Sequence, residues 1–326
     1  MKPLVFSKEN NNFEVMRLRK NLKGSLELND FIYSSSVYDD TYNIAHFITL
    51  EDFKKNKSEL KKGVKVVLSL LYCEEDFDGR LYKKNISDEY VIPKSDIETI
   101  NKATLVLVPS LKAKQYLILL GVKTKIEVLS CGVNVTKFLI KNTYVRTIAY
   151  RYLKCPEEMQ FMVSVIDCQD TEAEKILYGL ALSFPKIKFV VVCDYKHASH
   201  EMKKLFKKSP PNLLNTGPLE DDVYISLTYN AKAFLFVGSI QGNAIQAYEA
   251  MASETEIFAL EASVYQDIVI DKGNGYVYNN FDSLKEGIKL FLSDELPTTY
   301  KKEKAIANEN TLKNVGKKLI EIYKGI

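Results

Sequence analysis

The chain has 326 residues, of which 46% are hydrophobic, and its 45 lysines and arginines face 42 aspartates and glutamates, for a formal charge of +3. This length exceeds what one hydrophobic core usually serves, so two domains are expected, and the hydrophobic content excludes a disordered chain. A charge so nearly balanced gives no reason to expect a nucleic-acid partner.

Short apolar runs alternate with amphipathic stretches along the chain, which is the pattern of parallel strands covered by helices. Buried strands are expected at residues 64–72, 103–109, 187–193 and 231–237, and helices at 111–121, 172–183 and 283–292. A fresh strand and helix series begins after a polar stretch near residue 142. We therefore expect an α/β protein with a Rossmann-like domain over residues 1–142, a second one over 143–297, and a helical tail over 298–326 that packs back on the first.

The compartment expected from the sequence is the cytoplasm. No apolar run approaches the roughly 20 residues of a membrane span, and the first residues, MKPLVFSKENNN, lack the apolar core of a signal peptide. The five cysteines are odd in number and widely spaced, as expected of reduced thiols. A basic helix with Lys112 and Lys114 allows peripheral contact with an anionic membrane at its inner face, with a solvated helix face as the alternative.

One segment of the second domain has the pattern of an anion site. Residues 238–252 (GSIQGNAIQAYEAMA) follow a buried strand, turn at Gly242 and open a helix. The amides of Gly242, Asn243 and Ala244 are then free donors at a helix N-terminus, where a diphosphate is favoured. Glu249, about two turns later, offers acceptors for ribose hydroxyls. The alternative is an ordinary strand–turn–helix crossover with Glu249 exposed.

This segment resembles the E-G-x-G-x-P-x-x-E-A-M-A motif of retaining family-4 glycosyltransferases, with Gln241 and Glu249 at the spacing of its two glutamates. Other stretches resemble the family in the same order along the chain. They are YNIAH at residues 42–46, EEDF at 74–77, VPS at 108–110, KIEVLSCGVNVTKF at 125–138, YQD at 265–267 and NGY at 274–276. The EEDF stretch resembles a motif of the family branch that glucosylates membrane diacylglycerol lipids.

The resemblance implies a GT-B fold, in which two doubly wound Rossmann-like domains face each other across a cleft. It also implies a hexosyltransferase that uses a nucleotide-diphosphate sugar as donor substrate, retains the anomeric configuration and needs no cofactor and no metal. Gln241 and His46 are then the catalytic candidates, Gln241 touching the sugar. The donor is held by Gly242, Asn243, Ala244, Glu249 and Gly132, and His46 and the turn at residues 74–78 border the acceptor, which is a lipid, a glycan or a protein.

The departures from the family pattern support a second hypothesis. Gln241 replaces a glutamate and Ala244 a glycine, while Thr171 and Glu172 stand where the family has the arginine and lysine that bind the diphosphate. Charged hydrogen bonds contribute roughly 1.5 to 3 kcal/mol each, so losing two costs about 3 to 6 kcal/mol. The alternative function is a catalytically silent GT-B paralogue that serves as adaptor or regulatory subunit of a partner glycosyltransferase.

Two further patterns predict no site. Asp76 and Asp78 have the D-x-D spacing of a metal-binding pair but belong to an acidic turn, which is more often solvated. His197 and His200 lie three residues apart without a third ligand nearby in sequence, so they are expected at the surface and not on zinc.

Overall fold

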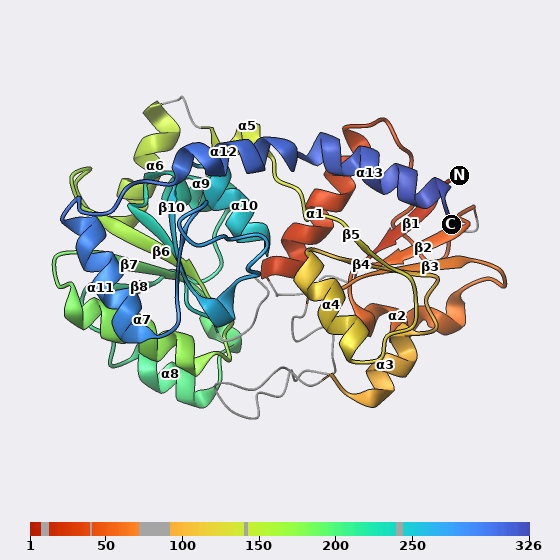
Figure 1. Cartoon of the computed structure of the whole chain (residues 1–326), viewed down its shortest axis with the longest axis horizontal. Coiled ribbons are helices and arrows are strands. Elements are labelled where there is room, and N and C mark those ends of the chain that lie inside the picture. Colours follow the sequence, from red (N-terminus) through yellow and green to blue (C-terminus); the bar gives the residue numbers. More distant parts are fainter. Residues whose placement is uncertain (8–12, 40, 72–91, 140–142, 239–243) are drawn as a thin grey trace. The chain divides into compact units, whose positions relative to one another are not determined.

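A computed structural model describes residues 1–7, 13–39, 41–71, 92–139, 143–238 and 244–326, with the side chains of 143 and 300–303 left out of the description. The chain divides into two compact units (Figure 1). Unit 1 comprises Met1–Gly132 and Asn310–Ile326, and unit 2 comprises Val133–Glu309.

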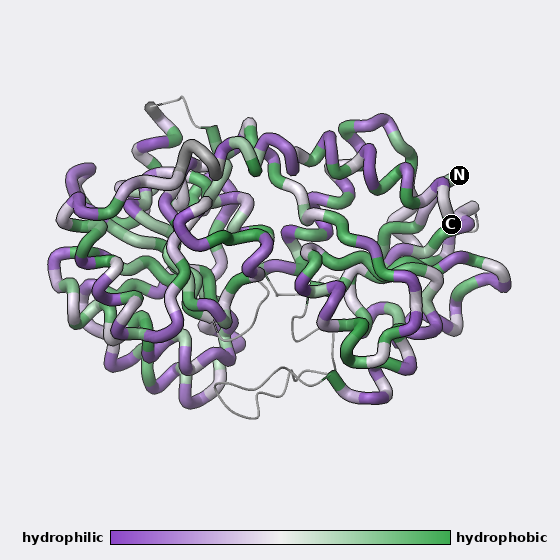
Figure 2. Tube along the Cα trace, in the orientation of Figure 1, coloured by the Kyte–Doolittle hydropathy of each residue, from purple (hydrophilic) through white to green (hydrophobic). Residues whose placement is uncertain are grey.

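Unit 1 is built on a parallel sheet of five strands in the order β1-β2-β3-β4-β5. The strands are β1 (Pro3–Phe6), β2 (Ile44–Phe47), β3 (Lys65–Ser69), β4 (Leu105–Val108) and β5 (Ile126–Val128). Its helices are α1 (Phe13–Glu27), α2 (Leu50–Asn56), α3 (Lys94–Ile100), α4 (Leu111–Leu119) and α13 (Leu312–Lys324). Strands β1 to β4 are almost continuously buried, as parallel strands covered on both faces must be, whereas only Ile126 is buried on the edge strand β5; Figure 2 shows the buried strands as hydrophobic segments.

The last helix, α13, belongs to unit 1, and Figure 1 shows it alongside α1. The Thr311 side chain caps its first turn by accepting from the Asn314 amide. Gly316 faces the Ser25 carbonyl of α1 so closely that a Cβ at this position would collide with it. Asn29 adds a hydrogen bond of 3.0 Å from Nδ2 to the Lys313 carbonyl. The absence of a side chain at Gly316 is therefore what allows the two helices to pack.

Unit 2 holds a parallel sheet of six strands in the order β11-β10-β9-β6-β7-β8. The strands are β6 (Phe161–Val165), β7 (Lys188–Val192), β8 (Leu213–Asn215), β9 (Ala233–Phe236), β10 (Glu256–Leu260) and β11 (Tyr276–Tyr278). Its helices are α5 (Val135–Phe138), α6 (Thr143–Leu153), α7 (Thr171–Ser183), α8 (His200–Phe206), α9 (Asp221–Asn230), α10 (Ala244–Ala252), α11 (Phe281–Leu292) and α12 (Tyr300–Glu309). The chain runs outward from β6 in one direction and then returns to continue from β9 on its other side. This order is that of a doubly wound Rossmann sheet.

The α/β class and the two parallel sheets are those expected from the sequence, and the strands expected at 64–72, 103–109, 187–193 and 231–237 correspond to β3, β4, β7 and β9. The division between the units falls after Gly132, ten residues before the expected junction. The expected tail is also split. Its first helix, α12, packs on α10 within unit 2, and only α13 belongs to unit 1.

The packing of α13 on α1 generates the first prediction. Gly316→Ala places a methyl group against the Ser25 carbonyl, and we expect it to destabilise the protein by about 1 to 3 kcal/mol although alanine is the better helix former. Gly325→Ala is the matched control, because the atoms nearest to a Cβ there lie 3.6 Å away. Urea unfolding curves measure both variants. Equal midpoints for the two variants would show that Gly316 does not control the packing.

Candidate functional site

The place in unit 2 where a ligand site is expected is fixed by the order of its strands. In a doubly wound sheet the crevice for a ligand lies at the carboxyl ends of the two strands between which the chain changes direction. Here these strands are β6 and β9, which pair through Met162–Ala233 and Val163–Phe234. The two helices that begin beyond them are α7 and α10. The candidate site therefore consists of the loops that follow β6 and β9 and of the N-termini of α7 and α10.

The N-terminus of α7 carries carboxylates where a diphosphate site needs positive charge. Asp170 caps the helix by accepting from the Ala173 amide at 3.0 Å. Glu172 is exposed and pairs with Lys175 at 2.7 Å, so the lysine that could have approached an anion is engaged by a neighbour. Burial raises the pKa of Asp167 in the same loop. Thr171, between these acids, is half-buried.

The N-terminus of α10 is the remaining candidate for the diphosphate. Ala244 is its first residue and is buried. Gln241, Gly242 and Asn243 lie outside the described residues. Every residue of α10 is buried, so this helix runs through the interior of unit 2.

Glu249 occupies the second turn of α10 and is only 2% exposed, which differs from the exposed residue of the crossover alternative. Its Oε2 accepts a hydrogen bond of 2.9 Å from the Tyr224 hydroxyl of α9. A buried carboxylate requires such partners, because burial without them costs several kcal/mol. A carboxylate accepts up to about four hydrogen bonds, and Tyr224 supplies one of those made to Glu249.

Gln246 is a residue that the motif comparison missed, although it stands at the position of the proline in the family pattern. It lies one turn before Glu249 and is fully buried, and neither its Nε2 nor its Oε1 has a hydrogen-bond partner among the residues that the structure describes. An unsatisfied buried amide costs about 1 to 3 kcal/mol. The signal available in the sequence was a polar glutamine among the mostly apolar residues of this helix.

His46 lies in the interior of unit 1. Its side chain is fully buried on β2, and burial lowers its pKa to about 3, so the ring is neutral. Its Nδ1 is 2.6 Å from the Tyr323 hydroxyl of α13, and its Nε2 is 2.7 Å from Ser69 Oγ at the end of β3. The expectation that His46 borders an acceptor does not agree with this placement, because both ring nitrogens are engaged by the protein and no part of the ring is exposed.

Which atom donates in each hydrogen bond of the series Tyr323, His46 and Ser69 follows from counting the available donors. Burial raises the pKa of Tyr323, which keeps its hydroxyl protonated, and His46 Nδ1 is its one hydrogen-bond partner among the described residues. A hydroxyl that only accepted would leave a buried proton without a partner, so we assign Tyr323 as the donor to Nδ1. Nε2 then carries the ring proton and donates it to Ser69 Oγ. The Ser69 proton is therefore free to be donated in another direction.

Ser69 lines a small pocket at the carboxyl ends of β3, β4 and β5. The walls are otherwise mostly apolar and come from α1 and the three strand ends, and they comprise Leu18, Leu22, Leu70, Leu71, Leu107, Val108, Pro109, Leu129, Ser130 and Cys131. Burial raises the pKa of Cys131, which remains a thiol. The hydroxyl of Ser69, oriented by His46, is thus one of few polar groups that this pocket presents.

Gly132 ends the first segment of unit 1 and has a backbone φ of +70°. A Cβ there would lie 3.0 Å from Leu312 Cδ2 of α13, and its carbonyl accepts a hydrogen bond of 2.8 Å from Asn21 Nδ2. Packing and backbone conformation therefore account for a glycine at this position, and its predicted role in donor binding gains no support from these contacts.

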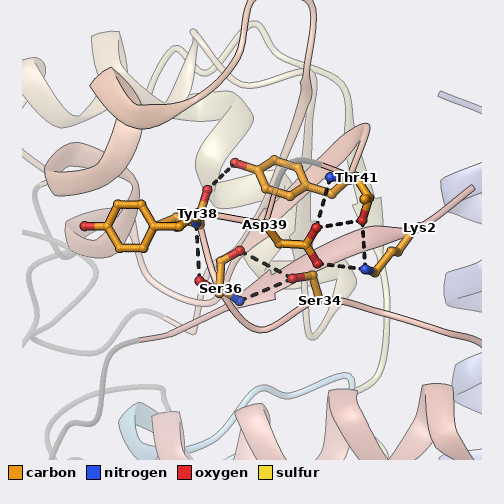
Figure 3. Close-up of polar contacts among 8 residues, drawn as sticks. Lys2, Ser34, Ser36, Tyr38, Asp39 and Thr41 are labelled. Carbon is orange, nitrogen blue, oxygen red and sulfur yellow. Dashed lines mark hydrogen bonds and ion pairs between the residues drawn. The ribbon is translucent and has the colours of Figure 1, made fainter.

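A polar cluster in unit 1 lies at the opposite, amino end of the sheet (Figure 3). Lys2 precedes β1 and contacts Asp39 Oδ2 at 2.7 Å and Thr41 Oγ1 at 2.8 Å. These contacts hold the pKa of Asp39 well below its usual range. The cluster fastens the loop before β2 to the start of β1, and its position separates it from the strand ends where a ligand site is expected.

The other sequence candidates are placed as follows. Asp76 and Asp78 lie outside the described residues. His197 is exposed and contacts Asp194 Oδ2 at 2.6 Å, and His200 is the first residue of α8. Within the described ranges, no group of three or more potential metal ligands is found, and no helix combines the length and hydrophobicity needed to cross a membrane.

Glu174 generates a prediction on pH dependence. The residue is fully buried on α7, with a hydrogen bond of 3.4 Å from Ser209 to Oε1 and, within the described part of the chain, no partner for Oε2. Burial raises the pKa of this carboxyl to about 7. Because the folded state holds the proton more tightly than the unfolded state, the stabilisation is complete below pH 4.5 and is lost as the pH rises through about 7.

We therefore expect Glu174→Gln to stabilise the protein by about 1 to 3 kcal/mol at about pH 8 and to change little at about pH 4. Urea midpoints over this pH range measure the effect. Glu172→Gln is the control, since Glu172 is exposed on the same turn. A midpoint that rises with pH equally in the wild type and in Glu174→Gln would contradict the assignment.

Gln246 generates a prediction on stability. Methionine has a similar length without the polar atoms, so Gln246→Met removes the unsatisfied amide and should raise the free energy of unfolding by about 1 kcal/mol or more. The control is Gln115→Met, at an exposed position of α4. A loss of stability in Gln246→Met would mean that the amide has a partner in solution.

Comparison with known proteins agrees with this architecture. Residues 174–312, which include β9, α10 and all of α7 except its first three residues, match the family Glycosyl transferases group 1. No curated protein sequence matches the chain. The HepE protein of Anabaena in complex with UDP-glucose is similar in structure, with 13% identity, full coverage of both chains and a TM-score of 0.77.

Two further solved structures extend this similarity. A glycosyltransferase from Rickettsia africae has 16% identity and a TM-score of 0.68, with 99% of this chain and 98% of that one covered. A trehalose-6-phosphate protein from E. coli bound with UDP-2-fluoro glucose has 11% identity and a TM-score of 0.64, with 95% and 78% covered. The chain has the GT-B fold, with two parallel-sheet Rossmann-like units, and its residues 174–312 match the family Glycosyl transferases group 1.

Proposed function

We propose that this protein transfers a hexose from a nucleotide-diphosphate sugar to an acceptor bound by unit 1, with retention of the anomeric configuration and without a metal or cofactor. The observation that carries the proposal is the match of residues 174–312 to the group 1 glycosyltransferases, because this region includes the buried Glu249 and the start of α10. The UDP and UDP-sugar complexes among the similar structures support a nucleotide sugar as the donor.

On the donor side, the diphosphate lies at the N-terminus of α10, where the amides of Gly242, Asn243 and Ala244 are donors. Glu249, held by Tyr224, accepts from the ribose hydroxyls. Gln241 contacts the sugar through its amide, which donates and accepts as a sugar hydroxyl does. Electrostatic stabilisation of the departing diphosphate then depends on the dipole of α10 and on the backbone amides at its start.

On the acceptor side, the small pocket at the ends of β3, β4 and β5 borders the acceptor. Its volume of about 10 Å³ admits one small polar substituent of the acceptor, to which the Ser69 hydroxyl can donate a hydrogen bond. Tyr323 and His46 act through Ser69 by fixing its orientation and are positioning residues. His46 is no longer a candidate for contact with the substrate.

A second function is favoured by the acidic N-terminus of α7. Asp170 already occupies a helix amide, and Glu172 engages Lys175, so this helix offers a diphosphate no net attraction. A catalytically silent paralogue that binds a partner glycosyltransferase would tolerate this arrangement. For either function we expect the protein in the cytoplasm, as the sequence predicts.

The test of function is transfer itself. The wild type is incubated with radiolabelled UDP-glucose and with a diacylglycerol, a disaccharide or a serine-containing peptide, and products are identified by mass spectrometry. A glycosylated product in one of these mixtures supports the transferase. Binding of UDP-glucose without any product favours the silent paralogue, and the absence of both rejects the donor assignment.

The donor site generates a prediction on affinity. Replacing Thr171 with Arg and Glu172 with Lys restores two charged contacts, and we expect nucleoside-diphosphate binding to tighten at least tenfold, about 1.4 kcal/mol. Ser183→Arg with Glu286→Lys gives the same charge change at exposed positions elsewhere on unit 2. Calorimetric titration with UDP, GDP and ADP measures both. An equal gain in the two double variants would mean that only net charge matters.

Variants of Glu249 and Gln241 test the two halves of the proposed donor site, the ribose contact and the sugar contact. We expect Glu249→Gln to weaken nucleotide binding more than Gln241→Ala does, because the ribose contact is the retained half of the motif. Tyr224→Phe is the control, since it removes the hydrogen bond to Glu249 while leaving the carboxylate. If Glu249→Gln and Gln241→Ala lose affinity equally, or not at all, the site assignment is rejected.

The acceptor pocket generates the last prediction of this section. Ser69→Ala should lower kcat/KM for the best acceptor about tenfold, the effect of one lost hydrogen bond, and should leave the KM for the nucleotide sugar unchanged. Ser58→Ala, at an exposed position of unit 1, serves as control. A change in the nucleotide-sugar KM alone would place Ser69 outside the acceptor site.

A further inference from the structure

Gln246 is a polar side chain that the described part of unit 2 buries without pairing it. It is the third residue of α10 (Ala244–Ala252, cyan in Figure 1), and its neighbours Ile245 and Ala247 are buried apolar residues. The side chain is fully buried, yet neither Nε2 nor Oε1 has a partner within the described ranges. An amide with both ends unpaired in the interior is unfavourable, which indicates a partner that the fold itself does not supply.

The position of Gln246 in α10 directs its side chain toward the ligand edge of the sheet. Side chains of an α-helix tilt toward the N-terminus of the helix, and Gln246 lies in the first turn. The helix begins beyond β9, at the carboxyl edge where the chain changes direction between β6 and β9. The amide group is therefore carried toward the same edge as the backbone amides of the first turn, which have no acceptor within the helix.

Glu249 shares one side of α10 with Gln246. It lies three residues later, about 4.5 Å farther along the helix axis. Its Oε2 accepts the hydrogen bond of 2.9 Å from the Tyr224 hydroxyl. With the ribose at Glu249 and the diphosphate at the helix start, Gln246 stands between the two. The part of a nucleotide that joins ribose to diphosphate is the first phosphate.

We propose that Gln246 donates from Nε2 to the phosphate adjacent to the ribose and so determines specificity for a nucleoside that carries a 5′-phosphate. The inference rests on the proposed donor site and adds one contact to it. A phosphate oxygen only accepts hydrogen bonds and therefore pairs with Nε2, while Oε1 can accept from a ribose hydroxyl. A neutral amide also waits in the interior at a smaller cost than a buried lysine or arginine.

The alternative partner of Gln246 is the backbone at the start of its own helix. A glutamine at the third helical position can accept with Oε1 from the amide of the residue before the helix, as in a capping box. The two assignments predict opposite effects of Gln246→Met on stability. Removing a cap lowers the free energy of unfolding, whereas removing an unpaired buried amide raises it.

Titration with uridine, UMP and UDP tests the contact, because these ligands differ only in their phosphates. Calorimetry of the full-length protein gives the dissociation constants, with uridine measured by competition against UDP. We expect Gln246→Met to weaken the binding of UMP and UDP about tenfold, the effect of one lost hydrogen bond to a charged acceptor. Its binding of uridine should equal that of the wild type, because uridine lacks the phosphate.

Urea unfolding without ligand is measured on the same variants. The unfolding midpoint of Gln246→Met should rise while its affinity for UMP falls, because the amide serves the ligand and not the fold. Gln160→Met is the control and should change neither quantity. Gln160 is exposed and lies just before β6, at the opposite, amino edge of the same sheet.

The outcomes separate this contact from the donor site as a whole. A midpoint that falls in Gln246→Met assigns the side chain to the cap and overturns the inference. Equal losses for uridine and UMP overturn it as well, because they place the contact on the nucleoside. Unchanged affinity for UMP, with binding intact in the wild type, rejects the contact alone. A wild type that binds none of the three ligands rejects the proposed donor site together with this contact.

Discussion

Parallel pairing of buried strands is the constraint on which both units depend. Every described strand pairs in parallel with its neighbours, so each return of the chain needs a crossover, and helices must cover both faces of the sheet. Because all carboxyl ends meet at one edge, the loops that can carry chemistry gather there as well. In unit 2 the change of direction between β6 and β9 leaves two helix N-termini, α7 and α10, beside the crevice.

These two helix starts have opposite electrostatic character. At α7 the amide of Ala173 is already bound by the Asp170 carboxylate, and Glu172 adds a second negative charge in the first turn. Such acids stabilise the helix through its dipole, but they remove the attraction that the same dipole would offer a phosphate. The stability of α7 and its ability to bind a diphosphate therefore oppose each other. In the proposed function, donor affinity in unit 2 therefore comes from α10 and from the ribose contact at Glu249.

The sequence predicted the strands better than the contacts of individual side chains. Runs such as residues 187–193 are apolar on both faces, and this signal depends only on burial, so β7 could be located without knowing its neighbours. The role of His46 could not be predicted in the same way. Its partner Tyr323 lies 277 residues later, on a helix whose packing depends on Gly316. Similarly, the partner of Glu249 is Tyr224, which belongs to no recognisable motif.

The division of the tail shows the same limit for whole helices. Both α12 and α13 follow Pro297 and both are rich in lysine, yet α12 packs on α10 and α13 packs on α1. The packing partner of α13 is set by close approach to α1, because Gly316 has no side chain and lets α13 reach the α1 backbone. Helix α4 illustrates the converse, because its buried side uses only Ala113 and Leu117 and thus leaves equally apolar residues outside. Periodicity gives the faces of a helix, but when two faces are apolar only the packing decides which one enters the core.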